Sequence, residues 1–207
     1  VGLKSQPFYA NGILYVSSSN ANVYALDGKT GEKRWMFHAY GSVLASPYVA
    51  DGIVYFGSSD GAVYALDAVN GLDKWTFQTN SSIGTSPVLA DNILYIPSTD
   101  NYFYALDAKN GDVHWKIDKR INPSLSPIIK DGVLFVGTID QYIHALDASD
   151  GSDVWSYRTN NPIVSIARST DGSLYYLSDD GSIVVLREGE GTRSMIRKGM
   201  IVFLALA

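Results

Sequence analysis

The segment VYALDGKTGEKRW at residues 23–35 decides the fold, because close copies of it recur along the chain. The copies are VYALDAVNGLDKW at 63–75, FYALDAKNGDVHW at 103–115 and IHALDASDGSDVW at 143–155. Each copy ends in a tryptophan, and successive tryptophans are 40 residues apart. A period near 40, with no apolar residues at helical spacing, is typical of β-propeller blades. The sequence therefore predicts an all-β repeat fold.

Four short strands fit each 40-residue unit. The first strand begins at a Ser-Pro step and ends in a two-residue turn such as Asp51-Gly52. Asp-Gly favours the type I′ hairpin, because both turn positions need positive φ. The second strand is continuously apolar, as in IVYF at 53–56, so we expect both of its faces to be buried. These features predict four-stranded antiparallel blades that stack face to face.

Two further features of the repeat predict where its strands lie. A proline recurs early in the first strand, at Pro7, Pro47, Pro87 and Pro127. Proline cannot donate to a central ladder, so this strand is expected at the edge of the blade that lines the channel. The third strand leads through an aspartate to a glycine four residues later, which is the chemistry of a tight turn. We therefore interpret these aspartates as structural.

The pattern Ala-x-Asp-x-x-x-Gly-x-x-x-Trp, present in full four times, resembles the tryptophan-docking motif of quinoprotein dehydrogenases and related PQQ-like repeat propellers. The resemblance covers nearly the whole chain. It implies that each indole docks onto the adjacent blade, as a large ring with one N–H donor suits a buried interface. The residues concerned are Trp35, Trp75, Trp115 and Trp155.

The fifth unit departs from the pattern, because Arg187 replaces the motif aspartate and Met195 replaces the tryptophan. This is typical of a terminal blade, and the alternative is a blade shaped by a partner. We expect one propeller domain over 1–200. Its blades fall near 1–40, 41–80, 81–120, 121–160 and 161–200. Because propellers close with about 4 to 8 blades, the five units form either a complete ring or part of a larger propeller, and self-association to complete a ring is a further alternative.

An apolar C-terminal tail at 201–207 follows the basic residues Arg193, Arg197 and Lys198. The tail is too short to span a bilayer, which needs roughly 20 residues. We interpret it as a strand that packs on the core or on a neighbouring chain. The alternative is the start of a membrane helix with a basic flank.

Composition limits the function classes. The chain has 207 residues, of which 46% are hydrophobic and 18% charged, as in ordinary globular domains. The net charge of −5 argues against nucleic acid as a main partner, because such affinity comes from clustered Lys and Arg. The chain has no cysteine, which excludes disulfides, thiolate metal sites and cysteine nucleophiles.

The resemblance raises one enzymatic alternative, a fragment of a PQQ-dependent dehydrogenase that holds PQQ with calcium. Alcohol-oxidising quinoproteins stack the cofactor under a disulfide that this chain lacks, although glucose-type relatives also lack it. Calcium needs convergent carboxylates, whereas the aspartates here recur at turns, and only Asp179-Asp180-Gly181 is mildly calcium-like. The three histidines fall at unrelated repeat positions. We therefore expect no catalytic, cofactor-binding or metal-ligating residues.

The connections between blades vary most from repeat to repeat, and loops on a rigid scaffold often carry binding. Basic and amide side chains concentrate in the later connections. They predict a partner-binding patch made of Arg120, Asn122, Arg158, Asn160 and Arg168, beside Lys119 and Asn161. The alternative is that these are ordinary solvated loop residues.

We accordingly predict a non-catalytic scaffold for protein–protein interaction. In repeat pattern the chain resembles the periplasmic propeller lipoprotein of the outer-membrane β-barrel assembly machinery. Similar repeats occur in extracytoplasmic sensor domains of bacterial kinases and in cell-surface proteins. The resemblance implies an extracytoplasmic location, periplasmic or cell surface, with membrane contact only through a partner or the C-terminal tail.

Overall fold

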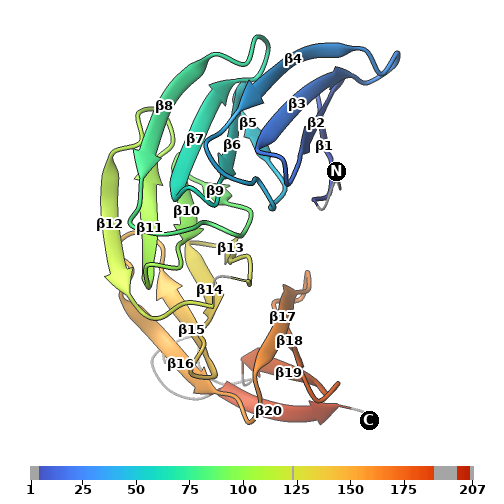
Figure 1. The fold of residues 1–207 in the computed structure, drawn as a ribbon. Coiled ribbons are helices and arrows are strands. Elements are labelled where there is room, and N and C mark those ends of the chain that lie inside the picture. Colours follow the sequence, from blue (N-terminus) through green and yellow to red (C-terminus); the bar gives the residue numbers. More distant parts are fainter. Residues whose placement is uncertain (1–4, 123, 189–199, 206–207) are drawn as a thin grey trace.

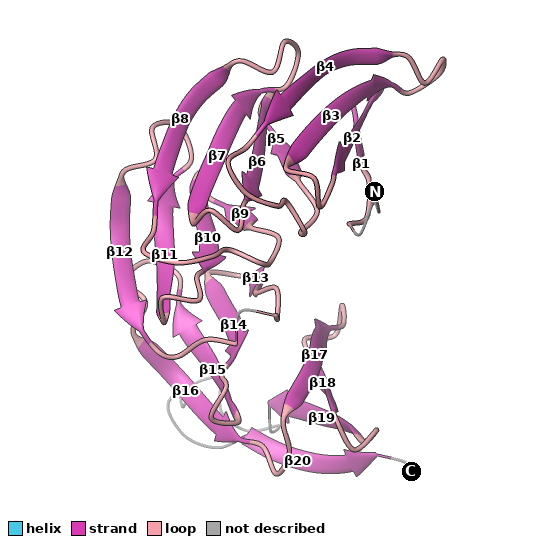
Figure 2. Cartoon of the chain, in the orientation of Figure 1, coloured by secondary structure: helices cyan, strands magenta, loops and turns pink. Residues whose placement is uncertain are grey.

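The computed structural model describes residues 5–122, 124–188 and 200–205, and this part of the chain consists of strands and loops without a helix (Figure 2). The strands form five antiparallel sheets of four strands each, and every sheet keeps the order of the chain. The all-β prediction of four-stranded antiparallel propeller blades is confirmed.

Each blade takes its strands from one repeat. The first blade contains β1 (Phe8–Ala10), β2 (Ile13–Ser17), β3 (Asn22–Asp27) and β4 (Lys33–His38). The second contains β5 (Tyr48–Ala50), β6 (Ile53–Gly57), β7 (Ala62–Asp67) and β8 (Asp73–Gln78). The third contains β9 (Val88–Ala90), β10 (Ile93–Pro97), β11 (Tyr102–Asp107) and β12 (Val113–Asp118). The fourth contains β13 (Ile128–Lys130), β14 (Val133–Gly137), β15 (Tyr142–Asp147) and β16 (Asp153–Arg158).

The fifth blade contains β17 (Ile163–Arg168), β18 (Leu174–Ser178), β19 (Ile183–Glu188) and β20 (Met200–Ala205). Most of the run that we set apart as a C-terminal tail thus supplies the outer strand of this sheet, since Ala205 of β20 pairs with Ile183 of β19. The basic residues before it, Arg193, Arg197 and Lys198, lie outside the described residues. In the described part of the chain, no helix has the length and apolar character needed to cross a membrane.

Local chemistry explains the shape of each blade. Asp51 and Gly52 have φ of 48° and 74°, as the two-residue hairpin between β5 and β6 requires. The first strand lies at the edge of its sheet and begins directly after the proline in the first four blades. In the fifth blade Ile166-Ala167 replaces Ser-Pro, and β17 is accordingly six residues long instead of three.

The five blades form an open arc, which Figure 1 shows with β1, β5, β9, β13 and β17 nearest the centre and the fourth strands at the rim. The first and fifth blades face each other across the open side of the arc. The described residues thus do not form a closed five-blade ring.

The hydrophobic core lies between blades. Tyr15 and Trp35 of the first blade pack in one cluster with Phe56 and Leu66 of the second. In β6, Val54, Tyr55 and Phe56 are at most 2% exposed, although their side chains alternate between the two faces of the sheet. The expectation that the second strands are buried on both faces is therefore confirmed for β6, β10 and β14, whereas Leu14 of β2 and Tyr175 and Leu177 of β18 are partly exposed.

Candidate interaction surface

Backbone hydrogen bonds define two faces of the arc. On one face, which we call the hairpin face, the turn after the first strand meets the turn after the third, as when Ala68 N donates to Gly52 O. On the other, which we call the loop face, the connection between blades meets the turn after the second strand, as when Ser59 N donates to Ser42 O. The loop face thus carries the connections that vary most between repeats.

The interfaces between blades repeat one polar contact. The indole Nε1 of Trp35 donates to Ala68 O of the next blade at 3.0 Å, and Trp75 and Trp115 donate in the same way to Ala108 and Ala148. The motif glycine makes room for the ring, since a Cβ added at Gly71 would lie 2.7 Å from the Trp35 indole. Trp155 packs against the Phe135 ring, with centroids 5.9 Å apart.

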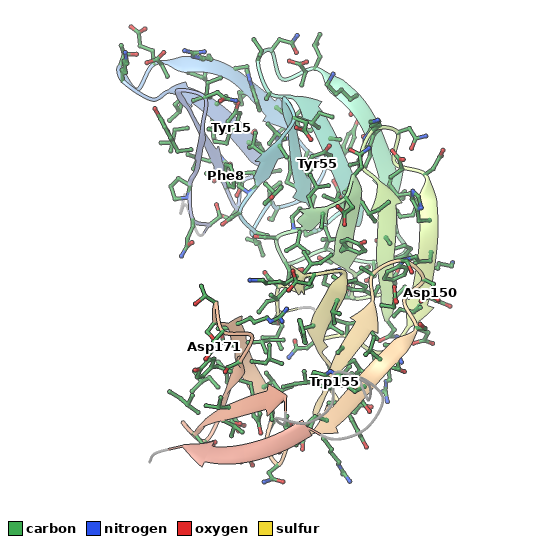
Figure 3. All side chains as sticks on the ribbon, turned by 180° about the vertical axis from the view of Figure 1, so that it is seen from behind. Phe8, Tyr15, Tyr55, Asp150, Trp155 and Asp171 are labelled. Atoms are coloured by element: carbon green, nitrogen blue, oxygen red, sulfur yellow. The ribbon has the colours of Figure 1, made fainter. Side chains whose placement is uncertain are left out.

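A second donor to the same carbonyls was not predicted from the sequence. The hydroxyl of Tyr15 donates to Ala68 O at 3.0 Å, and those of Tyr55 and Tyr95 reach Ala108 and Ala148. Figure 3 labels Tyr15 and Tyr55 in the first two blades. Burial, reinforced by the charges of Asp51 and Asp107, raises the pKa of Tyr55 to about 12. The tyrosine that recurs in the second strands was the available signal, and Phe135 is the fourth blade's departure from it.

The turn aspartates of the loop face also join the blades. Asp60 accepts hydrogen bonds from Tyr40 N at 3.0 Å, from the Tyr64 hydroxyl at 2.9 Å and from Ala62 N. Asp100 repeats these contacts in the third blade with its own turn and with Asn80 N. Burial, together with the hydrogen bond to Asp60, raises the pKa of Tyr64. These aspartates latch the incoming connection to the turn, in addition to shaping the turn.

The fourth blade replaces this latch with a different cluster. His144 stands where the second and third blades have the latching tyrosine, and its Nδ1 contacts Asp153 Oδ1 at 2.8 Å. Lys119, in the connection from the third blade, pairs with the other oxygen of Asp153. Burial opposes ionisation of Asp153, but the hydrogen bonds from Lys119 and His144 outweigh it and lower its pKa. Asp140, in the turn of this blade, is exposed.

The connection at 119–122 is rebuilt together with the latch. Arg120 is exposed and has φ of 48°, a left-handed conformation that non-glycine residues rarely adopt. Its carbonyl accepts from Ile139 N at 3.1 Å, and Asn122 N donates to Gly137 O at 2.8 Å. Ile121 pairs with Thr138 in an isolated bridge. The connection is therefore held directly against the turn between β14 and β15.

The next connection approaches the same turn from its other end. Thr159 N donates to Gln141 O at 2.8 Å, and Arg158 pairs with Tyr142 across the sheet. Arg158 and Asn160 are exposed, whereas the amide of Asn161 donates to Asp180. The structure thus brings four of the five predicted patch residues to one turn, together with the half-exposed side chain of Ile139. We call Arg120, Asn122, Ile139, Arg158 and Asn160 the fourth-blade surface.

Arg168 does not belong to this surface, which corrects the prediction. The strand β17 runs from the loop face to the hairpin face, and Arg168 is its last residue. Its guanidinium lies 5.1 Å from the centre of the Phe135 ring and 4.0 Å from Asp131, and its Nε donates to Gly172 O. Arg168 therefore lies between the fourth and fifth blades at the hairpin face.

The one calcium-like turn does not fit a metal site. One carboxylate oxygen of Asp180 accepts from the Ser182 amide and hydroxyl, and the other accepts from Asn161. Hydrogen bonds from Ser182 lower the pKa of Asp180. Across the described residues, no three His, Cys, Asp or Glu side chains gather in a group able to hold a metal ion. His38, His114 and His144 contact Asn22, Asp107 and Asp153 respectively.

Comparison with known proteins identifies a family and several solved structures that are similar to this chain. The model of the family described as outer membrane protein assembly factor BamB matches residues 2–118, 74–130 and 104–195. None of the curated protein sequences matches the chain. Among solved structures, BamB from Moraxella catarrhalis is similar with a TM-score of 0.76 and 19% identity, over 89% of this chain and 61% of that one.

Two further structures share the fold. The computationally designed Ika8 protein has a TM-score of 0.76 and 16% identity, over 90% of this chain and 58% of its own. Quinohemoprotein alcohol dehydrogenase from Comamonas testosteroni has a TM-score of 0.75 and 19% identity, over 99% of this chain and 43% of its own. The chain therefore spans between 43% and 61% of the length of these three proteins.

Proposed function

Since the chain belongs to the family described as outer membrane protein assembly factor BamB, whose members are PQQ-like repeat propellers, we propose that it is a non-catalytic scaffold for protein–protein interaction. The observation that carries the proposal is the fourth-blade surface. There His144 replaces the tyrosine of the Asp–Tyr contact that the second and third blades form, and exposed polar and apolar side chains surround one turn.

The second and third blades show how the regular repeat holds its connections. Asp60 and Asp100 use their carboxylates to hold the connections of the second and third blades. In the fourth blade the carboxylate that contacts the connection is that of Asp153, which pairs with Lys119 and His144 and lies outside the turn. Because the connection is held here by backbone hydrogen bonds and by Asp153, the exposed side chains of the turn are available for a partner, and interaction sites commonly lie on such loops.

The chemistry of the surface favours an acidic protein segment as partner. Arg120 and Arg158 are exposed cations on a chain with a net charge of −5. Arginine is enriched at protein interfaces because its guanidinium forms bidentate contacts with carboxylates. Ile139, 51% exposed, adds an apolar contact at the centre of the surface.

We place the protein outside the cytoplasm, in the periplasm or at the cell surface, because the family that it belongs to and its structural neighbours support that location. Contact with a membrane would then run through a protein partner. No cofactor is part of this proposal.

One competing function is a PQQ-dependent dehydrogenase that uses calcium, and the likeness to a quinohemoprotein alcohol dehydrogenase over 99% of the chain favours it. Titration with PQQ and Ca²⁺, followed by tryptophan fluorescence, separates the two functions. A scaffold shows no saturable quenching, whereas quenching at micromolar PQQ would replace our proposal with the enzymatic one.

The direct test is cross-linked affinity capture from native cells, with captured proteins identified by mass spectrometry. The wild-type chain is compared with R120E/R158E and with H38E/N80E, a control on the connections of the first two blades. We expect a stoichiometric partner that is lost only with R120E/R158E. Equal capture by all three chains, or loss with the control, would contradict the proposed surface.

A further inference from the structure

The inner strand of the fifth blade differs from the other four inner strands. β17 spans six residues, whereas β1, β5, β9 and β13 span three residues each. The proline that precedes each short strand is also missing, because Ala167 stands at its repeat position. A short length and a proline are two features by which proteins keep an exposed strand edge from pairing with another chain. The fifth blade lacks both of them.

One edge of β17 has no partner strand. β17 is the first strand of its sheet, and its ladder with β18 runs from Ile163 to Arg168. Among the described residues no other strand pairs with it, and Figure 1 shows it on the inner side of the arc. Every residue of β17 carries a backbone N–H, since none is proline. The open edge therefore presents a row of unpaired N–H and C=O groups.

The outer strands of the first four blades are also six residues long and lie at sheet edges. Each of them carries at least two charged side chains, such as Lys33 and Arg34 of β4. Charged side chains on an edge strand oppose its pairing with another chain. The only charge of β17 is that of Arg168 at its end, where the guanidinium packs over the Phe135 ring. β17 is thus an edge that lacks this protection as well.

An apolar side chain is exposed beside the open edge. A β-bulge between Ile163 and Ser165 leaves Val164 out of the ladder, and Val164 is 51% exposed. The equivalent residues of three other repeats are also exposed, namely Leu44, Gly84 and Ser124. The exposure of Val164 is therefore a property of this position in the repeat, and it makes an apolar contact available to a bound segment.

The open edge begins at the fourth-blade surface. Asn160 precedes Ile163 by three residues, and the Pro162 carbonyl between them accepts from Asp179 N at 3.1 Å. β17 then runs from the loop face to the hairpin face. A segment that pairs antiparallel with β17 runs the other way, so its C-terminal end lies at the loop face, on the side of Arg158. A partner bound at the fourth-blade surface can thus continue along β17.

We propose that the open edge of β17 binds an extended segment of the protein partner, which adds a further strand to the sheet of the fifth blade. This inference rests on the proposed function, because it states the form in which that partner binds. In such β-augmentation the backbone hydrogen bonds supply affinity and alternate side chains supply specificity. The segment carries an apolar residue that contacts Val164 and acidic residues at its C-terminal end that pair with Arg158.

The experiment measures hydrogen exchange of the whole chain with and without a synthetic peptide. In the peptide valine and threonine alternate, and glutamates follow at the C-terminal end. We expect the faster-exchanging amides of β17 to slow on the order of tenfold at saturating peptide, because pairing protects them from solvent. The matched control within the chain is β13, the short inner strand that follows Pro127, and its exchange should not change.

A modified peptide tests whether the backbone is recognised. A peptide of the same sequence with all of its backbone amides N-methylated keeps the side chains but has no backbone donors. We expect it to leave the exchange of β17 unchanged. Because this control leaves the protein unaltered, its result does not depend on the folding of any variant.

Two variants test the missing proline. Ala167→Pro restores the residue of the first four blades and removes one backbone donor from β17. Ala167→Thr is the matched control, because it also enlarges the side chain but keeps the N–H. We expect the unmodified peptide to slow exchange in Ala167→Thr and to have no effect in Ala167→Pro.

Three outcomes would overturn the proposal. The first is unchanged exchange of β17 with the unmodified peptide. The second is equal slowing with the N-methylated peptide, and the third is equal slowing of β13. If the first outcome occurs while R120E/R158E still loses the captured partner, only this inference fails. If the peptide slows β17 while R120E/R158E captures normally, the strand site stands and the fourth-blade surface is contradicted instead.

Discussion

The first three blade interfaces and the fourth differ at their centres. In the first three, one alanine carbonyl accepts both an indole and a tyrosine hydroxyl, with every donor to oxygen distance between 3.0 and 3.1 Å. In the fourth, Phe135 replaces the tyrosine and Arg168 packs over its ring. The repeat forms this contact at three interfaces and lacks its tyrosine at the fourth. The comparison therefore separates residues that stabilise the fold from positions where the sequence has changed for another reason.

The largest effect should come from removing an indole at a regular interface. Trp75→Ala deletes a ring that is 7% exposed together with its bond to Ala108, and should lower the free energy of unfolding by about 3–5 kcal/mol. Trp155→Ala should cost less, since its interface lacks the tyrosine contact. Urea unfolding measures both, and equal losses would remove the distinction between the interfaces.

The latch provides the next comparison. Asp60→Ala removes three hydrogen bonds from a partly buried carboxylate and should cost about 1–2 kcal/mol. Asp140→Ala, at the same turn of the fourth blade, should stay within about 0.5 kcal/mol. Urea unfolding measures both variants. A larger loss of stability for Asp140→Ala than for Asp60→Ala would contradict our inference that the Asp140 carboxylate does not hold a blade connection.

A tyrosine at a regular interface should contribute about 1 kcal/mol through its hydroxyl. Tyr55→Phe keeps the ring and deletes the bond to Ala108 O, which retains the Trp75 indole as a donor. The matched control is Phe135→Tyr, which restores the repeat at the fourth interface. Thermal unfolding should show a loss for the first variant, and no loss would mean that the hydroxyl is dispensable.

Alkaline pH should act on the same tyrosine. Its pKa is raised from 10.0 to about 12 in the folded chain. The stability that it contributes is therefore complete below pH 10 and is lost as the pH rises through about 12, because the unfolded tyrosine ionises first. Tyr55→Phe should flatten the fall in stability between pH 10 and 12, and an unchanged pH profile would contradict the burial of this hydroxyl.

The smallest effect concerns the fourth interface itself. One guanidinium nitrogen of Arg168 is buried without a hydrogen-bond partner among the described residues, and the distance to Asp131 is 4.0 Å. Replacing a poorly paired buried charge by an apolar side chain is often neutral or stabilising. Arg168→Met should therefore change the free energy of unfolding by less than about 1 kcal/mol. A large loss would show that this interface depends on its charge.

The sequence predicted what depends on local chemistry and on the period. Asp-Gly turns, the first strand after each proline, and buried second strands all follow from residues close together in the chain. The tyrosine contact was not predicted, because its acceptor lies 53 residues away and depends on how the blades stack.

The candidate site shows the same limit. Arg120, Asn122, Arg158 and Asn160 lie on the loop face because they flank blade connections, and their role in binding a partner stays a prediction. Arg168 was misplaced, although its position just before the Asp171-Gly172 hairpin was a signal for the opposite face. Figure 3 labels Asp171 on the hairpin that follows β17.

Site-specific photo-cross-linking tests the central claim, which is that the fourth blade differs from the second and third blades because it binds a partner. A photoreactive residue is placed at Ile139 or, as the matched control, at Thr99, which occupies the same position in the turn of the third blade. Irradiation in native cells should give a discrete protein adduct from position 139 and none from position 99. Equal adducts from both positions, or an adduct from position 99 alone, would contradict the account.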